Sequence, residues 1–261
     1  MIGVFDSGIG GLTVVRALLD RLPDHDITYL GDTARTPYGS KSAATIVKYS
    51  LKNTEFLLRQ GAQLIVIACN TASSYAFEAV RDQFQMPVFE VIGPGARLAV
   101  ARSRRGRIGV IGTRAMVASG IYAEKIKREK PDAQVFAVPC PLLVPLVEEG
   151  WINKPETAMI VRKYLLPLKT RRIDTLILGC THYPVLRQVI QRKIGARVAL
   201  VDSAEAIAEQ VGACLDVPRP VEPRPGRSHR LTVFVTDIAE QFRKTAQLIL
   251  RQPVTIHQAD L

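Results

Sequence analysis

Two cysteines of this 261-residue chain follow two similar segments. The apolar run from Leu64 to Ala68 is followed by Cys69, and the run from Leu176 to Gly179 leads in the same way to Cys180. Such runs of Ile, Val and Leu are typical of strands buried on both faces of a parallel sheet. Residues that follow these strands lie at the carboxyl edge, where open α/β sheets bind ligands. The sequence therefore predicts two thiols in equivalent positions, which suits chemistry on opposite sides of one substrate.

Side chains that form hydrogen bonds follow both cysteines. Asn70 and Thr71 come after the first, and Thr181 and His182 come after the second. Such groups can hold the carboxylates of an amino acid, and His182 is the only one of four histidines that adjoins either thiol. A single cysteine at the end of a strand is usually a small buried apolar residue. Two in matched segments, each with such neighbours, favour catalysis.

The other two cysteines, Cys140 and Cys214, have apolar or helical neighbours, and we interpret them as packing residues. The four cysteines are widely spaced, form no CxxC pair and have no histidines at ligand spacing. A disulfide framework and a structural zinc site are therefore not expected.

A second pair of segments indicates an internal repeat. Ile2 to Gly8 resembles Ile108 to Thr113, which begins 106 residues later, and the two strand-end cysteines are 111 residues apart. Similar offsets favour a duplicated unit of about a hundred residues. The alternative is that α/β proteins contain many similar strand-turn segments.

The segment from Asp6 to Gly11 joins a strand to a helix, so its amides could hold an anion at the helix N-terminus. Thr13 stands where a dinucleotide-binding GxGxxG pattern would end, and no Walker-type GK[ST] follows. Asp6 is either a local cap of its own turn or part of a functional site.

The composition indicates a globular chain, because 47% of its residues are hydrophobic and no run of 18 apolar residues occurs. The chain starts with strand-like residues rather than a signal pattern, so we expect a cytoplasmic protein. The net charge is +11, with basic clusters within 102–107, 169–172 and 219–230 that lack interleaved aromatic residues. These clusters either form a solvated basic surface or create a positive potential that steers a dicarboxylate substrate to the protein. Nucleic-acid binding is the less favoured interpretation.

Strand and helix patterns alternate, which predicts an α/β protein with parallel sheets flanked by helices. Gly93 to Gly95 is a predicted hinge and residues 216–230 a predicted surface loop. The expected strands lie near residues 3–5, 27–30, 64–68, 88–92, 108–111, 135, 176–179 and 231–235. The expected helices lie near residues 12–22, 43–60, 73–84 and 238–250.

Four motifs, in family order and spanning nearly the whole chain, resemble those of the glutamate racemases of the aspartate/glutamate racemase superfamily. They are Gly3-Val4-Phe5-Asp6-Ser7-Gly8-Ile9-Gly10-Gly11-Leu12, Gly31-Asp32-Thr33-Ala34-Arg35 with Pro37-Tyr38-Gly39, Ala68-Cys69-Asn70-Thr71-Ala72 and Gly179-Cys180-Thr181-His182-Tyr183-Pro184. The acidic segment from Val144 to Gly150 also resembles the family, whereas the Gly112-Thr113 turn fits less well, with Met116 close by.

The resemblance implies a fold of two pseudo-symmetric lobes with the active site in the cleft between them. Residues 1–92 and 205–261 would form the first lobe, carrying Cys69, and residues 93–204 the second, carrying Cys180. It implies interconversion of L- and D-glutamate by a thiolate/thiol pair without metal or other cofactor, supplying D-glutamate for peptidoglycan. We also expect a homodimer and no membrane partner.

The resemblance also assigns roles to individual residues. Asp6 would act beside Cys69, and His182 and Glu148 beside Cys180. The remaining expected site residues are substrate-binding or supporting. The substrate-binding set is Asp6, Ser7, Tyr38, Gly39, Asn70, Thr71, Thr181 and His182, and the supporting set is Asp32 and Thr113.

Two alternatives stay open at this point. The first is an aspartate or hydantoin racemase on the same fold, since pocket length cannot be derived from the sequence. The second is a regulatory protein that binds DNA or, as a side role, gyrase. Salt-sensitive DNA binding would distinguish this second alternative from an enzyme.

Overall fold

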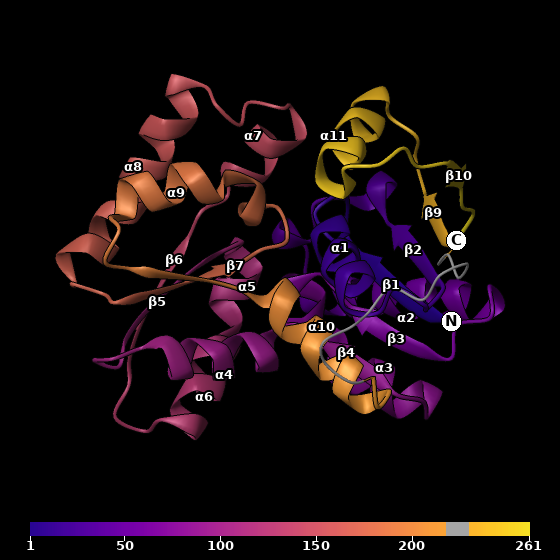
Figure 1. Cartoon of the computed structure of the whole chain (residues 1–261), viewed down its shortest axis with the longest axis horizontal. Coiled ribbons are helices and arrows are strands. Elements are labelled where there is room, and N and C mark those ends of the chain that lie inside the picture. The colour runs from indigo at the N-terminus through magenta and orange to yellow at the C-terminus, as the bar shows by residue number, and fades with distance from the viewer. Residues whose placement is uncertain (218–229) are drawn as a thin grey trace.

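The computed structural model describes residues 1–217 and 230–261, which form two parallel β-sheets in two halves of the molecule (Figure 1). The first sheet has the strand order β10-β9-β2-β1-β3-β4 and the second has the order β6-β5-β7-β8. The strands of the first sheet are β1 (Ile2–Asp6), β2 (Ile27–Gly31), β3 (Leu64–Ile67), β4 (Val88–Glu90), β9 (Leu231–Val235) and β10 (Ile256–Gln258). Those of the second are β5 (Arg107–Gly112), β6 (Gln134–Pro139), β7 (Thr175–Gly179) and β8 (Ala199–Asp202).

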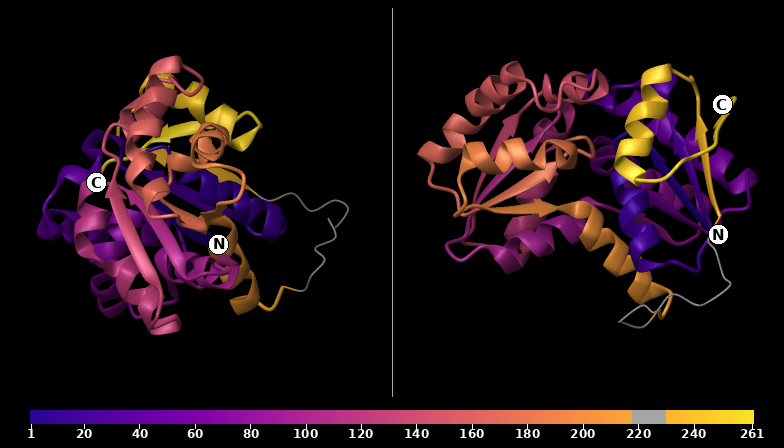
Figure 2. Two further views of the ribbon diagram at one scale, coloured as in Figure 1. Left: turned by 90° about the vertical axis from the view of Figure 1, so that its left-hand side faces the viewer. Right: turned by 45° about the horizontal axis from the view of Figure 1, so that its top comes forward.

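Helices flank both sheets, as the alternating pattern predicts (Figure 2). The helices that accompany the first sheet in the sequence are α1 (Leu12–Arg21), α2 (Ala43–Arg59), α3 (Asn70–Phe84) and α11 (Glu240–Leu250), with short 3-10 helices η1 (Thr33–Arg35) and η2 (Tyr38–Ser40). The others are α4 (Ile92–Arg102), α5 (Arg114–Ser119), α6 (Ile121–Glu129), α7 (Leu143–Glu148), α8 (Pro155–Thr170), η3 (Tyr183–Leu186), α9 (Arg187–Ile194) and α10 (Ser203–Cys214). Among the described residues, no helix is both long and apolar enough to cross a membrane.

The two sheets share one local topology. In the first, β1 lies between β2 and β3, and β4 follows β3; in the second, β5 lies between β6 and β7, and β8 follows β7. The cysteine-bearing strands β3 and β7 therefore occupy the same place beside the first strand of each sheet. This shared order supports the internal repeat predicted from the sequence, and it confirms the expected pseudo-symmetric α/β fold.

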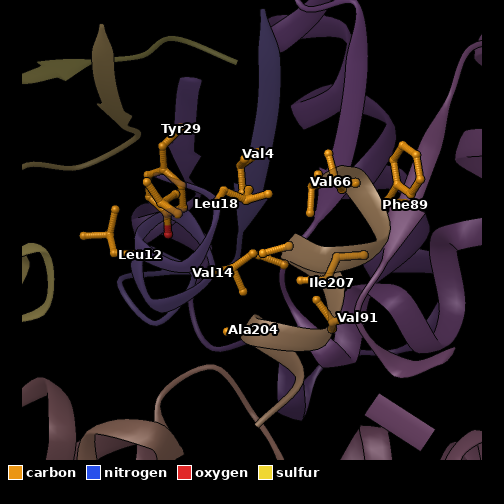
Figure 3. Close-up of a cluster of buried hydrophobic side chains, with 14 of the residues drawn as sticks. Val4, Leu12, Val14, Leu18, Tyr29, Val66, Phe89, Val91, Ala204 and Ile207 are labelled. Carbon is orange, nitrogen blue, oxygen red and sulfur yellow. The ribbon is translucent and has the colours of Figure 1, made fainter. Parts of the chain in front are cut away.

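A continuous apolar core joins the two halves. Val4, Leu18 and Val66 from the first sheet and α1 pack with Ala204 and Ile207 of α10 (Figure 3). The same cluster continues through α4 and α6 to the second sheet. Ile207 is completely buried, and burial of such a side chain contributes about 1.5–3 kcal/mol. This shared core brings the strand ends that bear the cysteines together in the structure.

The structure corrects two local predictions. The predicted hinge from Gly93 to Gly95 is wrong, because these residues lie in the first turn of α4. The Glu90 carboxylate accepts hydrogen bonds from the amides of Ile92 and Gly93, and a proline in a first turn has no amide to satisfy. Helix α3 begins at Asn70 rather than near residue 73, because Cys69 is its N-cap. Most of the predicted surface loop at 216–230 lies outside the described residues.

Candidate active site

The two strand-end cysteines face one buried cavity between the halves of the molecule. Cys69 follows β3 and is 5% exposed, and Cys180 follows β7 and is 6% exposed. The cavity offers about 10 Å³ to the centre of a water molecule, which is roughly the space that one water needs. It is lined by Ser7, Pro37, Tyr38, Gly39, Cys69, Asn70, Thr71, Thr113, Val144, Cys180, Thr181 and His182. Both thiols therefore belong to one closed site.

The Cys69 thiol lies in a dry environment. Its Sγ is 3.6 Å from Ser7 Oγ and accepts a hydrogen bond from the amide of Ala72 at 3.5 Å. Burial, followed by the nearby charge of Asp6, raises the pKa of Cys69 to about 12. At neutral pH this group is a thiol, so it can give a proton before it can take one.

The Cys180 thiol has a cationic neighbour instead. Nδ1 of His182 lies 3.8 Å from Cys180 Sγ, and Nε2 lies 3.2 Å from Oε1 of Glu148. Burial lowers the pKa of His182, but the hydrogen bonds to Cys180 and Glu148, together with their charges, outweigh it and raise the pKa to about 10. The imidazolium therefore persists at neutral pH and can donate to both Cys180 Sγ and Glu148 Oε1.

Asp6 connects the two halves of the site. This fully buried carboxylate at the end of β1 accepts hydrogen bonds from the Gly8 amide at 3.0 Å and from the Thr181 hydroxyl at 3.1 Å. Burial raises its pKa, and the charge of His182 opposes this rise. Asp6 is thus the local cap that the turn sequence allowed, and it also contacts the segment that bears the second cysteine.

The glycines after Asp6 permit a close approach between α1 and this segment. A Cβ at Gly10 would overlap the Thr181 hydroxyl and the His182 ring. The Thr13 hydroxyl also lies 3.4 Å from the carbonyl oxygen of Thr181. The glycine-rich turn therefore has a packing role against the Cys180 segment.

Tyr38 lines the cavity, but its hydroxyl is already occupied. It donates to Oδ2 of Asp32 at 2.5 Å and accepts from Nδ2 of Asn53 at 3.0 Å. Asp32 is fully buried, and its Oδ1 accepts from the Thr236 hydroxyl at 3.1 Å. These bonds hold the Tyr38 side chain in place, and Pro37 and Gly39 on either side of it also line the cavity.

Hydroxyl groups of Thr71 and Thr113 meet across the halves at 2.9 Å. Thr113 is the N-cap of α5, and its Oγ1 also accepts from the Met116 amide at 3.2 Å. Asn70 is 2% exposed, and its Oδ1 accepts from the Tyr122 hydroxyl at 2.8 Å. Its Nδ2 is buried and has no hydrogen-bond partner in the described part of the chain.

All eleven residues predicted for catalysis or substrate binding converge on this region, with Asp6 and Glu148 just behind the cavity lining. Sequence reasoning missed Pro37 and Val144 of the lining, and it missed Asn53 and Tyr122 behind it. Val144 is the first residue of the acidic segment that resembles the family, so the sequence could have indicated it as a site residue. Asn53 and Tyr122 lie in helices outside the motifs, and nothing in the sequence indicated them. The described residues hold no cluster of three or more His, Cys, Asp or Glu side chains suited to a metal ion.

The raised pKa of His182 predicts a dependence of stability on pH. The pKa is about 10 in the folded chain and about 6.5 in an unfolded one, so the imidazolium stabilises the fold fully below pH 6.5. This contribution is lost as the pH rises from there through 10. We expect the thermal midpoint of the native protein to fall over this range more steeply than that of His182→Asn. Parallel slopes in calorimetry at several pH values would contradict the assignment.

Comparisons with known proteins were consistent with one another. The family model for Asp/Glu/hydantoin racemase matches residues 12–211. A glutamate racemase from Syntrophus aciditrophicus is 48% identical over 250 residues, covering 95% of this chain and 92% of that protein. The structure of glutamate racemase isoform RacE1 from Bacillus anthracis has a TM-score of 0.94 at 34% identity and covers 100% of this chain and 97% of that one. Glutamate racemase from Francisella tularensis, in complex with D-glutamate, has a TM-score of 0.89 at 35% identity, with coverages of 100% and 96%.

Proposed function

Because the chain belongs to the Asp/Glu/hydantoin racemase family, and its relatives are glutamate racemases, we propose that it interconverts L- and D-glutamate by proton transfer between Cys69 and Cys180. The enzyme is an isomerase. No metal or organic cofactor takes part in the proposed reaction. The D-glutamate that it forms would supply peptidoglycan synthesis.

One observation carries the mechanism, namely two thiols in equivalent positions with opposite electrostatic surroundings on one cavity. In one direction the Cys180 thiolate, stabilised by the His182 imidazolium, removes the α-proton from one face of the amino acid. The Cys69 thiol then gives its proton to the other face. One proton is taken and one is given, so Cys180 ends as a thiol and Cys69 as a thiolate. The opposite enantiomer reacts from this second state with the roles exchanged.

Neutral donors around the cavity can stabilise the charge that develops on the substrate. Deprotonation at the α-carbon places additional negative charge on the adjacent carboxylate, where oriented donors in a dry site act most strongly. The candidates are the hydroxyls of Ser7, Thr71 and Thr181, the Asn70 amide and the backbone near Gly39. The cavity is too small for glutamate, so the two halves must separate to admit it and close again for reaction.

We also propose a division of the chain into two lobes and its assembly into a homodimer. Strands β9 and β10 complete the first sheet, and Ile207 packs against it, which supports a first lobe of residues 1–92 and 205–261 and a second lobe of 93–204. We propose a homodimer in solution, which light scattering coupled to size-exclusion chromatography would test.

Circular dichroism tests the proposed reaction directly. Purified protein is incubated with D-glutamate and separately with L-glutamate, without added pyridoxal phosphate and with a chelator present. We expect both signals to decay to zero, because the equilibrium constant of a racemisation is one. Decay with aspartate alone would keep the mechanism and change the substrate. Failure with both amino acids would contradict the proposal.

A further inference from the structure

Tyr122 is a buried side chain of α6 that touches the site only through another residue. It is 3% exposed, does not line the cavity, and donates its hydroxyl proton to Oδ1 of Asn70 at 2.8 Å. Asn70 adjoins Cys69 and lines the cavity. The contact therefore connects a helix of the second half to a candidate substrate-binding amide of the first.

The hydroxyl of Tyr122 has a single proton to donate, and Asn70 Oδ1 is its acceptor. The Ser203 side chain at the start of α10 lies close to the same phenol, because both border Gly95. A Cβ added at Gly95 would lie 3.2 Å from Ser203 Cβ and 3.3 Å from Tyr122 Oη.

The hydrogen bond from Tyr122 selects one of the two orientations of the Asn70 amide. If the amide turned over, Nδ2 would face the Tyr122 oxygen and the hydroxyl proton would have no acceptor at this position. In the orientation observed, Nδ2 is the end left over, and it is buried with no hydrogen-bond partner among the residues that the structure describes. A buried amide donor without a partner requires an explanation, and a ligand oxygen in the adjoining cavity supplies one.

We propose that Tyr122 is a positioning residue that, through its bond to Asn70 Oδ1, holds Asn70 Nδ2 as a donor to the substrate carboxylate. The inference rests on the proposed racemisation, in which charge on that carboxylate grows as the α-proton leaves. A donor set in place before the reaction stabilises that charge without reorganising. The loss of Tyr122 therefore affects turnover more than substrate binding.

The test compares Tyr122→Phe with Tyr75→Phe by steady-state circular dichroism on both enantiomers of glutamate. Tyr75 is a matched control, because its hydroxyl also bonds across the halves, to the carbonyl of Ala115 at 2.8 Å rather than to Asn70, and it does not line the cavity. We expect Tyr122→Phe to lower kcat about tenfold, as for one lost hydrogen bond, with KM changed less than about threefold. Tyr75→Phe should stay within about twofold of the native enzyme in both constants.

A double-mutant cycle separates positioning from a general structural effect. In an Asn70→Ala background, Tyr122→Phe should change kcat by less than about twofold, because no amide remains to be oriented. An equal loss in the native and Asn70→Ala backgrounds would overturn the inference. A native protein that does not racemise glutamate would instead contradict the proposed function.

Nitrogen-15 NMR supplies a readout that is independent of turnover. The side-chain amide signals of Asn70, assigned by their absence in Asn70→Ala, should shift in Tyr122→Phe and stay in place in Tyr75→Phe. Unchanged Asn70 signals in Tyr122→Phe would overturn the inference whatever the activity.

Discussion

Replacing Cys69 or Cys180 with alanine is expected to lower racemisation by at least about 1,000-fold in both directions while the chain stays folded. Each thiol is the only group that the proposed mechanism places on its side of the substrate, so either loss interrupts the transfer. Because the equilibrium constant is one, kcat/KM must fall equally for the two enantiomers. Circular dichroism of each enantiomer measures the loss, and thermal unfolding shows that the fold is retained.

The other two thiols serve as controls for this experiment. Cys214 is exposed, so the packing role predicted for it is wrong, whereas Cys140 is buried and its Sγ is 3.5 Å from the carbonyl oxygen of Val138. Cys214→Ala should leave turnover and stability unchanged. Cys140→Ala should lower stability by about 1 kcal/mol and retain turnover. If Cys140→Ala abolished turnover in a folded protein, the assignment of the two catalytic thiols would be wrong.

Exchange of the α-proton in deuterated water distinguishes a two-base mechanism from a site that is merely damaged. Each single variant keeps one thiol, which can still remove and return a proton on its own face. We expect Cys69→Ala and Cys180→Ala to retain slow exchange with opposite enantiomers. Exchange of the same enantiomer by both variants would contradict the placement of the thiols on opposite faces.

The position of both thiols could be predicted because the signal is local. The segments that became β3 and β7 are short apolar runs, and all their residues are buried. A parallel strand of this kind places whatever follows it at one edge of a sheet, so Cys69 and Cys180 could be placed before the structure was known. The repeat made the two positions equivalent, and the shared strand order of the two sheets explains why.

What the sequence left out depends on contacts between distant segments. Tyr122 is 52 residues from Asn70, and Asn53 is 15 from Tyr38, with no pattern that connects the members of either pair. The hinge prediction failed for a similar reason, because Gly93 is capped by the carboxylate of Glu90 and so begins a helix. Glycine and proline are strong signals of a turn only when no such cap is present.

The protonation states of the thiols were also beyond the sequence. An ordinary cysteine titrates near pH 8.5, and identical residues in matched motifs give no reason for a difference. The structure supplies two reasons: burial raises the pKa of Cys69 to about 12, and the His182 imidazolium lies beside Cys180. Pseudo-symmetry of the fold thus does not extend to the electrostatics of the site.

Replacing His182 with asparagine is expected to lower kcat about 100-fold at neutral pH. The substitution removes the positive charge 3.8 Å from Cys180 Sγ, so the thiolate loses the partner that stabilises it. Stability should change much less than turnover at this pH. Native turnover from His182→Asn would remove this residue from the mechanism.

The dependence of kcat on pH tests the role of the His182 imidazolium, and the structure predicts the direction of the change. The native enzyme should lose kcat as the pH rises through about 10, where His182 gives up its proton. Glu148 helps to raise this pKa through its hydrogen bond and charge, so Glu148→Gln must shift the alkaline limb to lower pH. His182→Asn has no imidazole to titrate, so its pH profile should lack the alkaline limb. If ionisation of the substrate's amino group caused the limb, the limb would remain in this variant. A limb that stays at the same pH in Glu148→Gln would show that another group controls it.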